Sequence, residues 1–554
     1  MKLSLTICAL LLVALLLPLA GFSQASVGEK DESYGIEGVQ TLPFAVGKGN
    51  RQIIDVQSDG YSIVAGQINK RDGSIGLMRL DETGMPDLSF GHEGMKILPV
   101  RGSVRDLLVM PDDRILVAAI QIHEENSDMV VFQLEKDGRP VELFGRQGKQ
   151  TINFGEWDDP AKLGLTADGS IMLAGNTSTG DWSNRDFGIA RLTSQGRLDP
   201  HFGQRGRKII DIGKYDNCRD LHVFPDGRMM IAGTTRSEKF DEFVVFKLLE
   251  SGRLDPSFQQ KGYKQFHLSK VHDYCQRMAV YPDGKIAMLG HAKLAEGGYG
   301  FDLVVMRMDE HGYQDESFGG DGMVSFDLGG AEYGADLLLQ ADGNLLVLGS
   351  SNHKIAMLRL LNNGGIDPSF GRGGHRVFRI GGRSIDGPSE MHMQADGKLL
   401  IAGTTKASFT VMRIHGNPYL VGLGDVLAAD WDKKGVMENA YAGLSFSRAF
   451  SLDAWLKGPD FTPKEDTQIS ATQEAGPAKH QIARKAHLAI GKNFSLTVIW
   501  DIDMNAHYYI NGRYSQSVRE GKQYAEPSVQ PLIKRPMQTR QARKKSFWML
   551  KSLH

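Results

Sequence analysis

The sequence predicts an all-β protein whose main part is a seven-bladed β-propeller. Three observations lead there: one phrase is copied seven times, apolar residues alternate with period two around each copy, and no helical periodicity separates the copies. The clearest copy runs from Ala341-Asp342-Gly343 to Gly349. We call its aspartate the anchor and number the copies repeats 1 to 7. The anchors are Asp59, Asp112, Asp168, Asp226, Asp283, Asp342 and Asp396.

Each repeat predicts four strands. Residues five and three before every anchor are apolar, which indicates a first strand with one buried face. The Asp-Gly turn favours a hairpin into an apolar second strand such as Leu399–Ala402. A third strand such as Leu303–Met308 follows, and then a turn phrase such as Gly364–Gly371 leads to a fourth strand such as Arg376–Ile380. The third strand carries a long polar side chain that we expect to be solvated or bonded along the sheet: Arg79, Gln133, Arg191, Lys247, Arg307, Arg359 and Arg413.

The two ends of the repeat array complement each other. A segment of the fourth-strand type, residues 41–46, precedes repeat 1, whereas repeat 7 ends at Ile414 without a fourth strand. We expect the N-terminal strand to complete the last blade, because closure removes free sheet edges.

The combined phrases resemble the Delta-60 repeat family of bacterial secreted and surface proteins. The resemblance rests on the "DPSFG" turns at Asp255–Phe258 and Asp367–Gly371, the "QADGK" hairpin at Gln394–Lys398, and the "AGT" strand endings, and it covers about residues 38 to 416. Repeat 2 departs from the pattern at Asp113, Ala119 and Val141, and repeat 4 at Gln259. The resemblance implies a β-propeller and brings no catalytic residues.

Residues 1–25 read as a secretory signal peptide, with Lys2, an apolar run from Ala9 to Leu19, and small residues before a cleavage point after Ala25. An uncleaved N-terminal anchor is the alternative. Residues 26–37 are expected to be a linker. No later segment is long and apolar enough for a spanning helix. We therefore expect a secreted or periplasmic protein.

Net charge limits the kinds of binding partner that the sequence implies, and the cysteine content limits the possible disulfides. The 64 basic and 66 acidic residues nearly balance, so net charge implies no nucleic acid partner. Beyond the signal peptide only Cys218 and Cys275 remain, at equivalent positions of adjacent repeats. A disulfide is conceivable in an oxidising compartment. We favour two unpaired thiols, because equivalent positions of neighbouring blades are often too far apart.

No catalytic, phosphate-binding or metal-binding signature is present, so we predict no catalytic residue, no metal and no cofactor. The residue six before the anchor is polar or charged in six repeats, and if the first strand lines the central channel these side chains ring one mouth. We predict a ligand-binding ring there, against the alternative that it only solvates a water-filled channel: Asp106, Lys162, Asp220, Arg277, Asp336 and Glu390.

The repeat pattern ends before Gly416, and the rest of the chain has a different sequence pattern. Residues 423–514 are expected to be a small β-rich domain, and its phrases Phe450–Gly458 and Trp500–Gly512 resemble laminin-G/concanavalin-like jelly rolls, a family that often binds glycans. Asp501, Asp503 and Asn505 have the spacing of a calcium loop, but a hairpin turn explains them better. Residues 515–554 are expected to be a disordered basic tail, with a possible weak contact to anionic surfaces.

These observations favour an exported, non-catalytic binding or scaffolding protein that presents a propeller surface to a protein or glycan of the cell envelope. One alternative is a carbohydrate-active enzyme, a lyase or hydrolase, at the channel mouth. Its acid and base would be Asp220 with His222, or Glu390 with His392. The other alternative is a lectin that acts through the C-terminal domain.

Overall fold

The computed structural model describes residues 28–45, 52–68, 73–178, 180, 183–294, 300–371, 373–379, 387–405 and 408–416, together with the backbone of four strands between 482 and 519. Within these residues every regular element is a β-strand, which confirms the all-β prediction for this part of the chain. The chain divides into two compact units, Met1–Phe446 and Ser447–His554. The expected signal peptide, the jelly-roll phrase Phe450–Gly458 and most of the expected tail lie outside the described residues. The described residues include no helix long and apolar enough to cross a membrane.

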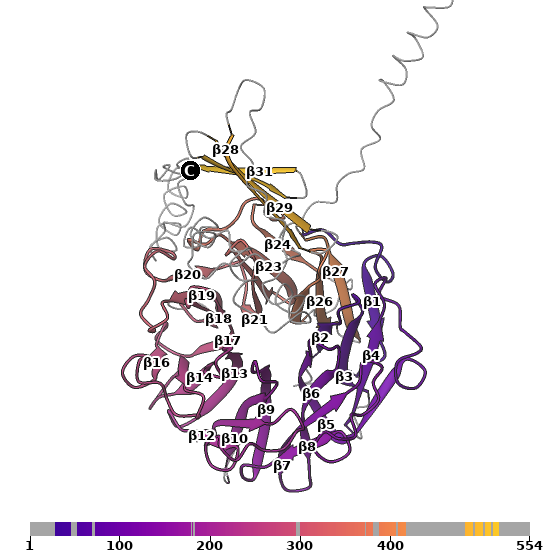
Figure 1. Cartoon of the computed structure of the whole chain (residues 1–554). Helices are drawn as coiled ribbons and strands as arrows, with labels where there is room; N and C mark the ends of the chain where they lie inside the picture. Colours follow the sequence, from indigo (N-terminus) through magenta and orange to yellow (C-terminus); the bar gives the residue numbers. More distant parts are fainter. Residues whose placement is uncertain are drawn as a thin grey trace, which may run out of the picture. The chain divides into compact units, whose positions relative to one another are not determined.

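The strands of the first unit follow the repeat pattern, four to a repeat (Figure 1). The first strands are β2 (Ile53–Val56), the second half of β5 (Met95–Val109), β9 (Trp157–Leu165), β13 (Asp216–Val223), β17 (Asp273–Val280), β21 (Glu332–Leu339) and β25 (Gly387–Met393). The second strands are β3 (Ser62–Gln67), β6 (Ile115–Ile122), β10 (Ile171–Ser178), β14 (Met229–Arg236), β18 (Ile286–Ala292), β22 (Leu345–Ser351) and β26 (Leu399–Thr404).

The outer strands complete each repeat. The third strands are β4 (Ser74–Leu80), β7 (Ser127–Leu134), β11 (Asp186–Leu192), β15 (Asp241–Leu248), β19 (Asp302–Met308), β23 (Lys354–Leu360) and β27 (Phe409–Ile414). The fourth strands are the first half of β5, β8 (Lys149–Ile152), β12 (Arg207–Ile210), β16 (Tyr263–Phe266), β20 (Met323–Phe326), β24 (His375–Phe378) and β1 (Val39–Leu42).

Strand pairing within each repeat is antiparallel in chain order. Repeats 4 to 7 form four separate four-stranded sheets, for example β17-β18-β19-β20, and the sheet of repeat 7 includes β1. Repeats 1 to 3 share one 11-stranded sheet, because β5 runs from the edge of repeat 1 into the first strand of repeat 2, and Ser127 of β7 pairs with Trp157 of β9. The first strand of each repeat contacts the first strand of the next, and β25 contacts β2.

The N-terminal segment belongs to repeat 7. Strand β1 pairs antiparallel with β27, with Val39 opposite Met412 and Leu42 opposite Phe409. The expected pairing is therefore present, although the strand spans 39–42 instead of 41–46.

The residues before β1, which we expected to be a linker, also pack into this repeat. Asp31 accepts a hydrogen bond from Arg413 Nε at 2.7 Å, and the ring of Tyr34 is buried beneath the Arg413 guanidinium, 4.7 Å from Cζ to the ring centroid. Residues Asp31 to Gly35 therefore supply the turn phrase that repeat 7 lacks at its own end.

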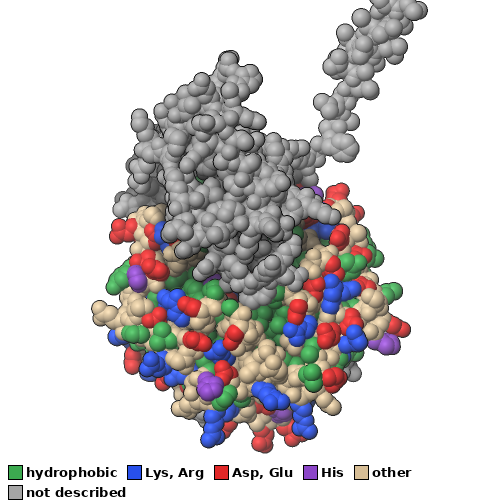
Figure 2. Space-filling view, viewed as in Figure 1, with side chains coloured by type: hydrophobic (Ala, Val, Ile, Leu, Met, Phe, Trp, Pro, Cys, Tyr) green, Lys and Arg blue, Asp and Glu red, His purple; other side chains and the backbone are tan. Residues whose placement is uncertain are grey.

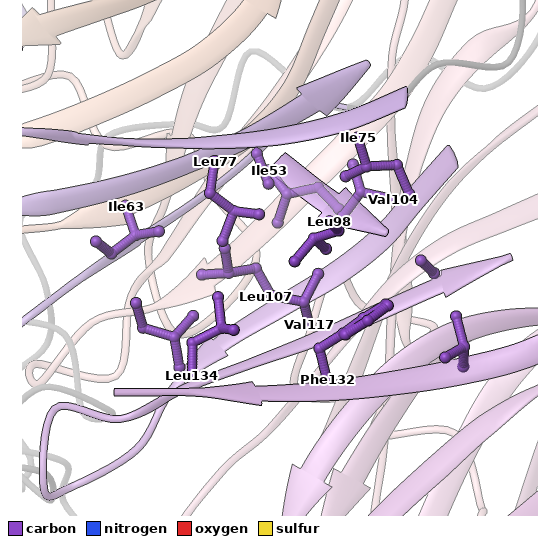
Figure 3. Close-up of a cluster of buried hydrophobic side chains, with 14 of the residues drawn as sticks. Ile53, Ile63, Ile75, Leu77, Leu98, Val104, Leu107, Val117, Phe132 and Leu134 are labelled. Carbon is purple, nitrogen blue, oxygen red and sulfur yellow. The ribbon is translucent and has the colours of Figure 1, made fainter. Parts of the chain in front are cut away.

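The hydrophobic core lies between neighbouring sheets. Figure 3 shows one cluster, in which Ile63 and Leu77 from repeat 1 face Leu107, Val117 and Phe132 from repeat 2. Similar clusters join the other neighbouring repeats, and one joins repeat 7 and β1 to repeat 1. Since each buried Leu, Val or Phe stabilises by about 1.5–3 kcal/mol, these interfaces hold the repeats together.

The long polar side chain of the third strand is buried in five repeats and half-buried in two, at Arg79 and Arg191. Of our two alternatives, solvated or bonded along the sheet, the solvated one is wrong, and the bonds of this side chain go to the turn phrase. Arg307 is 1% exposed, and its Nε donates to Asp315 Oδ2 at 2.8 Å. Its Nη1 reaches the Asn362 carbonyl oxygen of the next repeat at 2.6 Å. The aspartate of the turn phrase is the partner in six repeats: Arg79 with Asp87, Arg191 with Asp199, Lys247 with Asp255, Arg307 with Asp315, Arg359 with Asp367 and Arg413 with Asp31.

Repeat 2 lacks the ion pair between the third strand and the turn phrase. There the third strand carries Gln133 and the turn carries Val141, so both charges are replaced together. A buried charge is costly without its partner, which accounts for the joint loss.

In the second unit, four strands form one antiparallel sheet: β28 (Ile482–Ile490), β29 (Phe494–Asp501), β30 (Asn505–Ile510) and β31 (Arg513–Arg519). Strands β29 and β30 pair as a hairpin, with Leu496 opposite Ile510. The candidate calcium-loop residues Asp501 and Asn505 are the ends of these two strands, and Asp503 lies outside the described residues. The pairing of β29 with β30 agrees with a hairpin, while the turn between them lies outside the described residues.

Candidate functional site

The first strands enclose a pocket of about 210 Å³ in the first unit. Side chains six and seven positions before the anchors line it, and residues from all seven repeats contribute. They are Gln52, Ile53, Arg105, Asp106, Ala161, Lys162, Arg219, Gln276, Arg277, Gly334, Ala335, Pro388, Ser389 and Glu390. The pocket therefore lies at one mouth of the channel that the first strands surround.

In six of the seven repeats a β-bulge in the first strand turns successive residues toward this pocket, whereas β2 of repeat 1 has no bulge. In repeat 4, Cys218 pairs with Gly233 and Asp220 with Ala232, so Arg219 has no partner across the sheet. An extra residue of this kind bends the strand and re-aims its side chains. The same shift leaves Arg105, Ala161, Gln276, Ala335 and Ser389 unpaired in repeats 2, 3, 5, 6 and 7.

Four of the six predicted ring residues line this one pocket, and their charges are paired. Lys162 Nζ lies 2.8 Å from Asp106 Oδ1 and 3.3 Å from Glu390 Oε1. Arg277 Nε lies 3.1 Å from an oxygen of Asp336, which stands just beside the pocket. Burial lowers the pKa of Lys162, but the charges of Asp106 and Glu390 outweigh it and raise that pKa above its ordinary value.

The carboxylates of the ring also join neighbouring repeats. Asp336, for example, accepts a hydrogen bond from the backbone N–H of Met391 in the next repeat at 2.8 Å. Burial raises the pKa values of Asp106 and Asp336 to about 6 against these favourable contacts. In four other places a carboxylate accepts a hydrogen bond from a backbone N–H of the next repeat: Asp55 from Val109, Asp106 from Leu163, Asp220 from Met278 and Glu390 from Ile54. The carboxylates of the predicted ring therefore serve in large part to hold neighbouring repeats together.

The bulge residues supply two further cations that the sequence analysis missed. Arg105 Nε donates to Asp159 Oδ1 at 2.6 Å, so its charge is paired. Arg219 differs: its Nε is buried without a hydrogen-bond partner, and no ion pair is found for it among the described residues. Burial, and then the charge of Arg277, lower the pKa of Arg219.

A cluster of aromatic side chains lies in repeats 5 and 6, and one of them, His291, is close enough to Arg219 to feel its charge. The ring of Tyr274 is tilted against that of His291, with 5.4 Å between the ring centroids, and His291 lies 5.1 Å from both Phe301 and Tyr333. We call Tyr274, His291, Phe301 and Tyr333 the aromatic band. Tyr333 is 44% exposed, so the band reaches the surface. Burial, and then Arg219, lower the pKa of His291 to about 3, so its imidazole is neutral at pH 7.

Neither proposed acid–base pair comes together. His392 Nδ1 lies 3.2 Å from Asp55 Oδ1, while the Glu390 oxygens face Lys162 and the Ile54 N–H. His222 packs edge-on against Phe224, and burial lowers its pKa to about 4. The Asp220 carboxylate accepts the N–H groups of Leu221 and Met278.

Cys218 and Cys275 are buried and not bonded to each other. Burial raises the pKa of the Cys275 thiol, which keeps it protonated and unreactive. The two thiols therefore act as small core side chains.

Comparisons with known proteins give the fold. Residues 166–202, 225–258 and 340–370 match the family described as "Domain of unknown function (DUF5122) beta-propeller". No curated protein matches the sequence. The first unit thus has the β-propeller fold.

Solved structures with a similar chain course are distant in sequence. Virginiamycin B lyase from Staphylococcus aureus is 13% identical, with 68% of this chain and 99% of that chain covered and a TM-score of 0.42. Polysaccharide lyase Uly1 is 10% identical, with 69% and 95% covered and a TM-score of 0.41. Drosophila Plexin A in complex with Semaphorin 1b is 9% identical, with 68% and 87% covered and a TM-score of 0.36.

Proposed function

We propose that this chain is an exported, seven-bladed β-propeller of the Delta-60 type that binds an anionic glycan at the mouth of its channel, without catalysing a reaction. The seven copied repeats and the contact of β25 with β2 support the blade count. The pairing of β1 with β27 supports closure by the N-terminal strand.

The observation that carries the proposed ligand is the unpartnered guanidinium of Arg219. The other cations lining the pocket, Arg105, Lys162 and Arg277, face carboxylates of this chain. The Arg219 side chain is half-buried, and its Nε is buried without a hydrogen-bond partner. A charge in such a place is costly without a counter-ion, and a carboxylate or sulfate of a ligand would supply the missing charge through two parallel hydrogen bonds.

The aromatic band suggests that the carboxylate or sulfate group belongs to a sugar. Tyr274 and Tyr333 offer flat apolar faces with a polar edge, the kind of surface against which the C–H face of a sugar ring packs. The pocket of about 210 Å³ is smaller than the roughly 300–1,000 Å³ typical of a site that encloses a drug-sized ligand. It therefore suits one acidic substituent, with the rest of the glycan lying on the outer face.

The surface charge is consistent with local recognition. Figure 2 shows Lys and Arg side chains interspersed with Asp and Glu over the described residues of the face in view. With a net charge of −2 and both signs mixed on this face, the described residues in view offer no general attraction for polyanions. Selectivity would then come from Arg219 and the residues beside it.

A lyase is the second candidate, because a neutral His291 stands beside the Tyr274 ring and near Arg219. In such a reaction a base removes the proton α to a uronate carboxylate, the neighbouring C–O bond breaks, a C=C bond forms, and the departing oxygen takes up a proton. His291 is 6% exposed, however, and the ring carboxylates are bonded to backbone N–H groups, so the geometry favours binding.

The test compares uronate-containing or sulfated oligosaccharides with neutral ones of equal length, by calorimetry on the full chain. We expect binding of the acidic sugars only, and a loss of at least about tenfold in Arg219→Gln, since a charged hydrogen bond contributes about 1.5–3 kcal/mol. Arg139→Gln, at an exposed side chain in a turn of repeat 2, should bind normally. Equal binding of neutral sugars, or unchanged affinity in Arg219→Gln, would refute the proposal. A growing ultraviolet absorbance of a C=C bond conjugated to a carboxylate would establish the lyase instead.

A further inference from the structure

At the end of the sheets where the first strands begin, aromatic side chains are concentrated in one sector. The positions eleven and nine residues before the anchor stand at or just before the start of the first strand. In repeats 3 to 6 these positions include five aromatic residues: Trp157, Tyr215, His272, Tyr274 and Tyr333. In repeats 1, 2 and 7 they include none: Lys48, Asn50, Arg101, Ser103, Ile385 and Gly387. Because the repeats share one pattern, a change confined to four consecutive repeats distinguishes this sector from the rest.

Repeat 4 adds an arginine to this sector. Arg236 ends β14, and its Cζ lies over the ring of Tyr215, 4.9 Å from the ring centroid. Its Nε and Nη2 donate to the two carboxylate oxygens of Asp241 at 2.7 and 3.2 Å, and its side chain is 43% exposed. Among the described residues no acceptor is found for its Nη1. The ion pair therefore holds a flat guanidinium at the surface, with one amino group free to donate.

The row of side chains continues into repeats 5 and 6. Asp241 Oδ2 lies 3.0 Å from Nδ1 of His272, and the His272 ring is nearly parallel to that of Tyr274, with 6.2 Å between centroids and 15° between planes. Tyr274 lies opposite His291 in the β17–β18 pair, and the His291 ring lies 5.1 Å from that of Tyr333 in repeat 6. We call five of these residues the rim row: Tyr215, Arg236, His272, Tyr274 and Tyr333. All five are at least partly exposed, so the row forms one surface across three repeats.

Arg219 lies close to both halves of the rim row. Burial is the main cause of its lowered pKa, and the charged groups that act on it include Arg277 first and Tyr215 last. In the other half, the pKa of His291 is lowered by burial and then by Arg219. An acidic group bound to Arg219 would therefore lie near the middle of the row, with the surface of repeat 4 on one side and that of repeats 5 and 6 on the other.

We propose that the rim row binds successive sugar rings of one acidic polysaccharide, so that the glycan is held along its length and not by its end. This inference rests on the proposed function, because Arg219 holds the acidic group. Tyrosine rings and guanidinium planes offer flat faces to the C–H side of a sugar ring, and their polar edges bond its hydroxyl groups. A single sugar over the pocket would leave Tyr215, Arg236 and Tyr333 without a part in binding.

An acidic peptide suits the rim row less well. Acidic and phosphorylated peptides are generally recognised by clusters of arginines. The rim row instead combines four aromatic rings with one arginine, and the charge of that arginine is balanced by Asp241. Its chemistry therefore matches a chain of rings and hydroxyl groups with acidic groups at intervals.

The test measures affinity against chain length, by calorimetry on the full chain with di-, tetra- and octasaccharides of galacturonate and of chondroitin sulfate. We expect the octasaccharide of the preferred glycan to bind at least about tenfold more tightly than its disaccharide, because linked sites are engaged together. Tyr333→Ala and Arg236→Lys each remove one flat face outside the pocket. Each should weaken octasaccharide binding about fivefold or more and leave disaccharide binding within about twofold.

Two matched controls lie outside the rim row. Arg228 is bonded to Asp226 and lies over the ring of Phe224, much as Arg236 is held, but it precedes the opposite end of β14. Tyr313 is an exposed tyrosine in the turn after β19. Arg228→Lys and Tyr313→Ala should bind the octasaccharide as the wild-type chain does, and circular dichroism would check that all four variants are folded.

The outcomes separate this inference from the proposed function. Equal affinity for all lengths, or unchanged octasaccharide binding in Tyr333→Ala or Arg236→Lys, would overturn the rim row. If Arg219→Gln still weakened binding at every length, the proposed function would stand without it. Polyglutamate that binds as tightly as the octasaccharide would point to an acidic peptide and also overturn the inference. If no acidic sugar of any length bound, both proposals would fall.

Discussion

Gly349, the last residue of the repeated phrase in repeat 6, tests how tightly the bulge is packed. A Cβ at this position would lie 2.6 Å from the carbonyl oxygen of Tyr333 and 3.2 Å from Leu303 Cδ2. The bulge between Gly334 and Asp336 brings that carbonyl toward Gly349 across the β21–β22 pair. Since an ordinary contact needs about 3.4 Å or more, Gly349→Ala must push the β21 backbone away by several tenths of an ångström.

We expect Gly349→Ala to lower the free energy of unfolding by about 1–3 kcal/mol for overpacking, offset by about 0.4–1 kcal/mol from the lower entropy of the unfolded chain. Gly188→Ala is the matched control, because it is also a strand glycine but its Cβ would meet Thr177 Cγ2 at 3.4 Å, an ordinary contact. Urea unfolding followed by circular dichroism measures both variants. Equal urea midpoints for Gly349→Ala and Gly188→Ala would refute the packing argument, and so would a midpoint that is lower for Gly188→Ala than for Gly349→Ala.

Three further predictions concern charges. Arg413→Ala removes the buried guanidinium that donates to Asp31, while Lys398 Nζ remains 3.1 Å from that carboxylate; it should cost about 1.5–3 kcal/mol in urea unfolding, against less than about 1 kcal/mol for the exposed Arg139→Ala. Burial raises the pKa of Asp216 to about 7, above its unfolded value, so its contribution to stability should fall as pH rises from about 4 to about 7; Asp216→Asn should remove this slope from the urea midpoints. Gln133→Arg with Val141→Asp should restore the pair missing from repeat 2, so the double variant should be more stable than either single one, and a double-mutant cycle without coupling would contradict this.

The repeat pattern in the sequence predicted most of the first unit, because period-two alternation and Asp-Gly turns are local signals. Strand β22, for example, follows the Asp342-Gly343 turn as expected. The N-terminal turn was missed although it has a signal: Asp31, Ser33 and Gly35 match the turn phrase, but Glu32 and Tyr34 replace its Pro and Phe. The expected linker therefore concealed a part of repeat 7.

The pocket was predicted in part. Residues such as Asp106 and Lys162 were found because their polarity recurs six before the anchor, but their bonds to the next repeat depend on contacts far apart in sequence. Arg219 was missed because strict alternation places it on the opposite face from Asp220. The bulge overrides that alternation, and a single sequence carries no clear mark of it.

The N-terminal turn and strand have a consequence for how the chain folds. Arg413 and Asp31 are 382 residues apart in sequence, so the last sheet cannot be completed until the final repeat has been synthesised. Contacts over such separations slow folding, since the loop between them must be ordered first. A circular permutant that joins residue 416 to residue 28 and opens the chain at an exposed turn would make this contact local. It should refold faster than the natural order while retaining every side-chain contact of the first unit.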